Sequence, residues 1–198
     1  MAEESQYQGS QAFNQLLAAN EQVNLGTGSL VLSVPIAHLP GVHDDIALRI
    51  NLIYSAGGGG VFGLPRHWSI NLPFVIPGRT LVWAGSCYLI DKDWSSSEGY
   101  RSGIRYWNEK GTSFEEVIPP QPLPSGGKGK FSFRLRDKKG ITFCFDSTGK
   151  LLETVDRFGN CIAYSYVDQF SGPVGNKLKQ VVDGYGQQVL YGDRKSVV

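Results

Sequence analysis

The sequence predicts a mainly β protein made of antiparallel strands and hairpin repeats, with one short helix near the N-terminus. Apolar and polar residues alternate over long stretches, which is typical of strands that cover a core on one side. Glycine accounts for 25 of the 198 residues and aromatic residues for 12%. Glycine-rich turns between aromatic runs favour many short strands. An Asp-x-aromatic-Gly pattern also recurs near the C-terminus, which predicts a hairpin repeat.

The overall composition limits the classes of function. A chain of 198 residues can form one fairly large domain or two small ones. Its net charge is only +1, so no broad basic surface for nucleic acid is predicted. No apolar run approaches the ~20 residues of a membrane-spanning helix. The polar start shows no secretory signal, so we expect the chain to be cytoplasmic or exported by a specialised route.

The first predicted region, residues 1–22, is a polar N-terminus with a short helix at residues 10–20. Ser10 can cap the first turn of this helix, and apolar side chains recur along it at helical spacing. Those side chains belong to Phe13, Leu16 and Leu17.

Residues 23–118 form a predicted N-terminal β region. In two stretches, apolar residues at every second position are expected to face one side of a strand. They are Leu30, Leu32, Val34 and Ile36 in the first stretch, and Ile46, Leu48, Ile50, Leu52 and Tyr54 in the second. Residues 61–77 are predicted as one further strand-like segment, and four short strands are expected between residues 79 and 117.

Residues 119–130 are predicted to form a loop, because their prolines remove hydrogen-bond donors and their glycines remove stiffness. This loop is the best candidate for an internal boundary, and residues 131–198 follow it as repeated hairpins. Each hairpin is expected to turn on an Asp whose carboxylate accepts backbone N–H groups and a Gly with positive φ. The predicted turn residues are Asp137, Gly140, Asp146, Gly149, Asp156, Gly159, Asp183 and Gly186.

The stretch FDSTGKL, residues 145–151, resembles the YD motif Tyr-Asp-x-x-Gly-Arg-Leu of RHS/YD-repeat proteins. Residues 12–41 are similar to the opening of bacterial RHS-type chains, and residues 46–73 are similar to the segment that follows it. The resemblance extends over roughly residues 10–192. It implies β-sheet strips that coil into a hollow shell, as in insecticidal toxin complexes and bacterial contact-dependent toxins.

The resemblance also implies a role. The chain would be the N-terminal part of such a shell, a structural scaffold that encloses or presents a toxin or effector, and not an enzyme. Its expected partners are the remainder of a split or larger shell and the toxin cargo. The last repeat has no capping element, so its exposed edge could also pair with a second copy. No cofactor is expected.

No catalytic or metal-binding residues are predicted. His43, Asp44 and Asp45 form the most ligand-like cluster, with His38 nearby, but their spacing matches no metal pattern and turn-forming roles are favoured. His67 is expected to pack beside an aromatic ring and not to act as a base. The cysteines are isolated and odd in number, so reduced, mostly buried thiols are expected.

A carbohydrate- or cell-surface-binding β module is the alternative function. Aromatic faces on a β surface can stack on sugar rings, although packing between strands is the favoured explanation for such large side chains. The candidate stacking residues are Trp83, Trp94, Tyr106 and Trp107.

Overall fold

The computed structural model describes residues 20–24, 29–40, 46–56, 60–90, 106–109, 112–167 and 177–190. Within these residues the chain forms fifteen strands in three antiparallel sheets and no helix, which confirms the mainly β prediction. The predicted helix at residues 10–20 lies outside the described residues except for Asn20, where the first strand begins.

Two smaller sheets come from the N-terminal half of the chain. The first has the strand order β1–β2–β3–β4, with β1 at Asn20–Asn24, β2 at Ser29–Leu39, β3 at Leu48–Ser55 and β4 at Trp68–Ile70. The second has the order β5–β6–β7, with β5 at Phe74–Ile76, β6 at Thr80–Trp83 and β7 at Ser86–Leu89.

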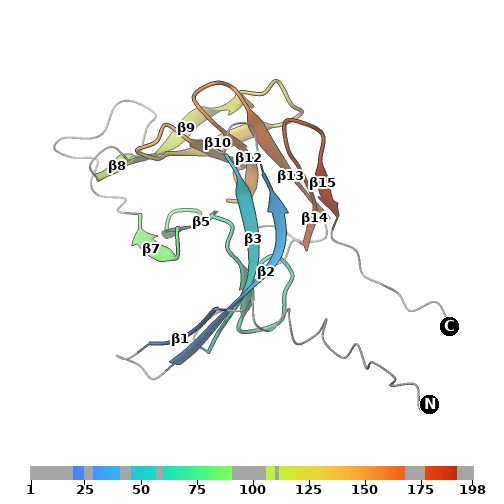
Figure 1. The fold of residues 1–198 in the computed structure, drawn as a ribbon. Helices are drawn as coiled ribbons and strands as arrows, with labels where there is room; N and C mark the ends of the chain where they lie inside the picture. The colour runs from blue at the N-terminus through green and yellow to red at the C-terminus, as the bar shows by residue number, and fades with distance from the viewer. Residues whose placement is uncertain are drawn as a thin grey trace, which may run out of the picture.

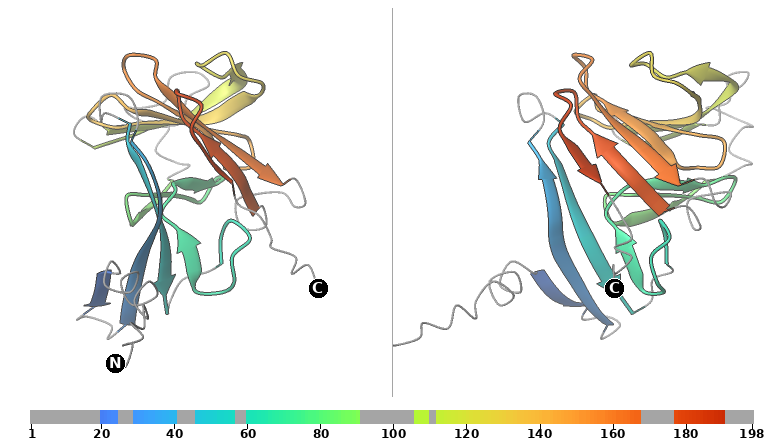
Figure 2. Two further views of the ribbon diagram at one scale, coloured as in Figure 1. Left: turned by 45° about the vertical axis from the view of Figure 1, so that its right-hand side comes forward. Right: turned by 90° about the vertical axis from the view of Figure 1, so that its right-hand side faces the viewer.

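The third sheet has eight strands, each beside its neighbour in sequence. They are β8 (Tyr106–Glu109), β9 (Thr112–Pro122), β10 (Lys130–Arg136), β11 (Thr142–Phe145), β12 (Leu151–Val155), β13 (Cys161–Val167), β14 (Lys177–Val182) and β15 (Gln188–Leu190). The edge strands of this large sheet are therefore β8 and β15. Figures 1 and 2 show the large sheet above the β5–β7 sheet, with β2 and β3 running past it toward β1.

One hydrophobic core joins the three sheets. Its fully buried side chains include Ile50 from β3, Val75 from β5, Leu81 from β6, and Leu135 and Phe145 from the large sheet. Because apolar side chains from every sheet meet in this core, none of the sheets could separate without exposing them to water.

The predicted loop at residues 119–130 is shorter in the structure, since β9 runs to Pro122 and β10 begins at Lys130. The prolines fit because the described residues of β8 pair only with residues 112–115, so no described strand needs N–H donors from the rest of β9 on that side. The register with β10 also shifts between Phe131 and Phe133, which accommodates extra residues of β9 as a bulge. The strands on both sides of the loop belong to one sheet.

Two strand predictions in the N-terminal region need correction. The pattern puts Ile36 on the same face as Val34, but a register shift between Pro35 and Ala37 changes the alternation, and Ile36 is 45% exposed.

The second correction concerns residues 61–77, which form two short strands and not one. Asn71 ends the first by exchanging hydrogen bonds with β3. By contrast, the alternation predicted over residues 46–54 holds at its start, where the apolar side chains of Ile46 and Ile50 are buried.

A second, smaller cluster lies on the opposite face of the large sheet. Its buried members are Val117, Leu123, Phe131 and Cys144. The loop at residues 123–129 supplies one of them, and Ser125 in the same loop donates hydrogen bonds from its N–H and O–H groups to the carboxylate of the buried Glu153. The loop is therefore held against the sheet both by apolar contact and by hydrogen bonds.

The large sheet meets β5 at the turn that follows β11. The backbone N–H of Val75 donates a 3.0 Å hydrogen bond to the carbonyl oxygen of Gly149. Gly149 has a φ of 91°, and a Cβ there would overlap the backbone carbonyl of Val75. Glycine is thus required at this position for two reasons: its positive φ, and the close approach of the backbone of β5.

We expect Gly149→Ala to destabilise the fold more than Gly159→Ala or Gly186→Ala. All three glycines have positive φ, so each substitution should cost ~1 kcal/mol of backbone strain. Only at Gly149 would the new methyl group meet another backbone, which should add roughly 1–3 kcal/mol. Urea unfolding of the three variants measures the difference. Equal free energies of unfolding would show that the junction does not depend on this contact.

Candidate functional site

The eight predicted turn residues lie in four turns that share one hydrogen-bond pattern. In each turn the Asp N–H donates to the carbonyl of the residue four positions later, and the Gly N–H donates to the Asp carbonyl. The Asp Oδ1 atom accepts the N–H groups of the residues two and four positions later. The four glycines have φ between 79° and 91°. These contacts close each hairpin and leave the Oδ1 atoms fully used.

The second carboxylate oxygen differs from turn to turn. The Asp156 Oδ2 atom accepts a 2.7 Å hydrogen bond from the side-chain amide of Asn160, and the Asp146 Oδ2 atom lies 3.5 Å from the Lys150 ammonium. The Asp183 Oδ2 atom is buried and has no hydrogen-bond partner within the described residues. In the Asp156 and Asp146 turns, the residue four positions after the Asp therefore supplies the partner of this oxygen.

Hydrogen bonding lowers the pKa of Asp156. Burial by itself would raise the pKa of this carboxyl, but the Asn160 amide and the backbone N–H groups of Phe158, Gly159 and Asn160 outweigh that effect. The carboxyl is therefore ionised at neutral pH, where the ionised form accepts these hydrogen bonds best.

Three of the turns lie at one end of the large sheet. They join β10 to β11, β12 to β13 and β14 to β15, and because these strands are antiparallel the three connections fall on the same end. Phe158 and Tyr185 occupy the same position in two of these turns, and each is 64% exposed. The fourth turn, at Asp146, lies at the opposite end against β5. These three turns close their hairpins and place two exposed aromatic side chains at one end of the large sheet.

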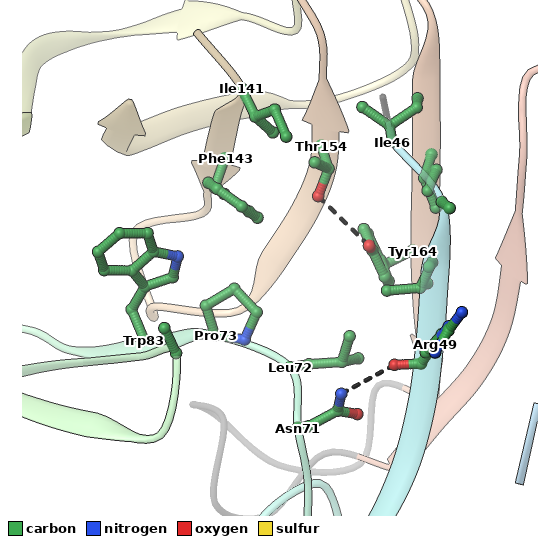
Figure 3. A pocket seen from close by; sticks show the side chains of 14 residues that line it. Ile46, Arg49, Asn71, Leu72, Pro73, Trp83, Ile141, Phe143, Thr154 and Tyr164 are labelled. Carbon is green, nitrogen blue, oxygen red and sulfur yellow. Dashed lines mark hydrogen bonds between the residues drawn. The ribbon is translucent and has the colours of Figure 1, made fainter. Parts of the chain in front are cut away.

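A cavity of about 270 Å³ lies where the three sheets meet (Figure 3). Its walls come from the start of β3, the link between β4 and β5, the end of β6, and the inner face of the large sheet. Most of the lining side chains are apolar, namely Ile46, Leu48, Leu72, Pro73, Trp83, Ile141, Phe143 and Ile162. Such a small, mostly apolar and partly open pocket suits an apolar group more than a charged substrate.

The polar atoms of the cavity are few. The Thr154 and Tyr164 hydroxyls lie 3.3 Å apart within hydrogen-bond distance, and both side chains point into the cavity in Figure 3. The Asn71 amide donates to the carbonyl oxygen of Arg49 at 2.8 Å, so both of those groups are paired. This arrangement contains no nucleophile beside a general base.

The cavity is the feature that the sequence did not predict, because its lining spans residues 46 to 164. The repeat pattern does contain a partial signal. Phe143 and Ile162 occupy matching positions six residues after a turn Asp, and both line the cavity together with the nearby Tyr164. The pattern identifies them as core-facing residues, but it does not show which strands they face.

The proposed stacking residues do not form one described surface. Trp83 is half-buried and lines the cavity, with its ring 6.2 Å from that of Tyr88. Tyr106 and Trp107 lie in the edge strand β8, and Trp94 lies outside the described residues. Among the described residues, Trp83 is thus the one candidate whose side-chain environment is defined, and it lies in the wall of the cavity.

The histidines and metal candidates are placed only in part. His43, Asp44 and Asp45 lie outside the described residues, and His38 is exposed on β2. His67 has a φ of 73° and its ring centroid is 6.0 Å from that of Tyr54, while its Nδ1 atom is buried with no partner within the described part of the chain. Over the described ranges no group of three His, Cys, Asp or Glu residues is arranged to hold a metal ion.

The prediction of mostly buried thiols is wrong, because only Cys144 is buried, while Cys161 is half-buried and Cys87 is exposed on β7. Burial, together with the nearby Glu153 carboxylate, raises the pKa of Cys144 to about 12. Burial and the Glu153 and Asp156 carboxylates also raise the pKa of the half-buried Cys161. Since the thiolate is the reactive form, Cys144 and Cys161 are poor nucleophiles at neutral pH.

No protein-family model matches the chain, and no curated protein matches it significantly. Solved structures do match. Among them is a chain in the pore form of the Tc holotoxin of Photorhabdus luminescens, carrying a mutation in TccC3, with a TM-score of 0.51 and 16% sequence identity. The match covers 84% of this chain and 10% of that chain, so this chain spans about a tenth of its neighbour's length. At this identity the likeness shows a shared β fold.

Within the residues that the structure describes, no helix is long and apolar enough to cross a membrane.

We expect Asp156→Asn to make stability less dependent on pH. The substitution keeps an Oδ1 acceptor for the turn N–H groups but removes the charge and the Oδ2 acceptor for Asn160. Because the folded pKa of Asp156 is lowered, its stabilising contribution is present above the unfolded pKa of about 3.9 and is lost as the pH falls through the folded pKa.

The wild-type protein should therefore be more stable than Asp156→Asn at neutral pH, and the gap should narrow below about pH 4. Urea unfolding at several pH values from neutral to acidic measures it. Parallel stability curves for the two proteins would mean that the charge of Asp156 does not contribute to folding.

Proposed function

We propose that this chain is a structural scaffold, part of an RHS/YD-type β shell that encloses or presents a toxin or effector, with no catalytic activity of its own. The observation that carries the proposal is the large sheet, in which repeated Asp-x-x-Gly turns connect strands in simple order. Strips built by repeating one hairpin unit can extend by adding strands, which is how repeat architectures grow. The fold likeness to a Tc holotoxin chain supports the same reading.

The chemistry of the described residues supports a scaffold more than an enzyme. Burial raises the pKa of Cys144 and Cys161, the Asp carboxylates of the turns accept backbone hydrogen bonds, and the cavity contains no nucleophile–base pair. Within the described residues, the two thiols are thus protonated and the turn carboxylates are engaged by backbone N–H groups.

The edges of the large sheet support a role in assembly. The outer strand β15 pairs on one side with β14, and its Leu190 is 65% exposed. An edge strand presents unpaired N–H and C=O groups that a further strand can satisfy. We propose that this edge pairs either with the remainder of a larger shell or with a second copy of the chain.

Catalytic silence is the first test of the proposal. The purified chain should hydrolyse none of a panel of chromogenic esters, glycosides and phosphates, and His43→Ala, Asp44→Ala and His67→Ala should change nothing. The expectation follows from the absence of an activated nucleophile among the described residues. An activity that disappears in any one of these variants would overturn the scaffold assignment.

Association through β15 is the second test. We expect the isolated chain to self-associate with increasing concentration, and Leu190→Lys to weaken this, because a charge on an edge strand opposes strand addition. Phe158→Lys is the matched control, since Phe158 is 64% exposed but lies on a turn and not on the edge. Sedimentation velocity at several concentrations gives the result. A monomer at every concentration, or equal effects of the two variants, would contradict the edge model.

A further inference from the structure

The cavity at the meeting point of the three sheets has features of a binding site that scaffolding does not need. It is a partly open pocket lined by the start of β3, the link between β4 and β5, the end of β6 and three strands of the large sheet. Aromatic side chains contribute to it from three elements: Trp83 from β6, Phe143 from β11 and Tyr164 from β13. Aromatic walls favour flat aromatic ligands through offset or edge-to-face contacts. Apolar walls around a few placed polar atoms are typical of small-molecule sites.

The volume of the cavity limits what can enter. An apolar cavity of about 150 Å³ holds one benzene molecule, so a cavity of about 270 Å³ has room for one or two fused rings. A ligand that extended toward Ile46, Leu72 or Ile162 would have to displace side chains that are buried in the core. The volume therefore favours a compact ring system.

The hydroxyl pair supplies a specific polar contact. Thr154 is buried, and its Oγ1 atom lies 3.3 Å from the Tyr164 hydroxyl. A Thr hydroxyl has one donor hydrogen and two acceptor lone pairs. Whichever of the two hydroxyls donates, at least one lone pair of Thr154 remains available to a group in the cavity. A ligand with one N–H or O–H group could donate to it.

We propose that this cavity binds a small aromatic molecule of one or two rings that carries a single hydrogen-bond donor, with indole as the representative compound. The ring would lie against Trp83, Phe143 and Ile141, and the donor would point to Thr154 Oγ1. Binding here is separate from pairing at the sheet edge, since no residue of the edge strand β15 lines the cavity.

Isothermal titration calorimetry with indole tests the proposal on the intact chain. We expect saturable binding of one indole per chain. Ile141→Trp should abolish it, because Ile141 lines the cavity and a larger side chain there would fill the space. Leu89→Trp is the matched control, since it adds the same residue at a position that is 81% exposed on β7. This control should bind indole as the wild type does.

A second pair of measurements isolates the hydrogen bond and does not depend on the filled variant folding. Thr154→Val should weaken indole binding roughly two- to tenfold, the effect of losing one neutral hydrogen bond. The same variant should leave the binding of 1-methylindole unchanged, because that compound has no N–H to donate. Thr142→Val, on a strand of the same sheet but outside the cavity lining, should affect neither ligand.

Three outcomes would overturn the proposal. The first is the absence of saturable indole binding to the wild-type chain. The second is binding that survives in a folded Ile141→Trp variant, which would place the site elsewhere. The third is an equal loss of indole and 1-methylindole affinity in Thr154→Val, which would mean that the hydroxyl shapes the cavity without accepting a hydrogen bond from the ligand.

Discussion

The contact between Gly149 and Val75 sets how the sheets meet, and the rest of the structure depends on it. The Asp146 turn brings its glycine against the backbone of β5, and the 3.0 Å hydrogen bond from Val75 fixes the distance. Because no side chain separates the two backbones, the β5–β7 sheet lies directly beneath the large sheet. Val75 and Phe145 are then fully buried in the same core. The cavity is the space left beside this junction, where Trp83 and Phe143 line a common wall.

The turns themselves could be predicted from sequence because their causes are local. An Asp and a Gly three residues apart are enough to close each turn. The Asp supplies one carboxylate oxygen that accepts two backbone N–H groups, and the Gly tolerates the positive φ. The same holds for the alternation that buries Ile46 and Ile50, since a period of two fixes which side chains share a face. Local rules of this kind gave the hairpin repeat and the fold class.

The predictions failed where distant residues decide the outcome. Pro119 and Pro122 indicate a loop, yet they lie in β9, where the described residues of the neighbouring strand β8 require no N–H donor from either proline. The face of Ile36 changes because β2 shifts register against β3, which no pattern within β2 reveals. The need for glycine at position 149 was predicted from φ alone, whereas the backbone it contacts is 74 residues away in sequence (149 − 75 = 74). Sequence periodicity carries no information on such pairings.

The large sheet is covered on its inner face and on part of its outer face. Its inner face packs on the two smaller sheets, and part of its outer face carries Cys144 and Phe131 beneath the loop at residues 123–129. A strand added at β15 would therefore extend the sheet without uncovering either cluster. The cavity is lined by both partners of the Gly149 junction, the large sheet and the smaller ones. A molecule that binds there only in the folded state would stabilise that state by mass action. The interface that aligns the sheets would then also be the one that a ligand stabilises.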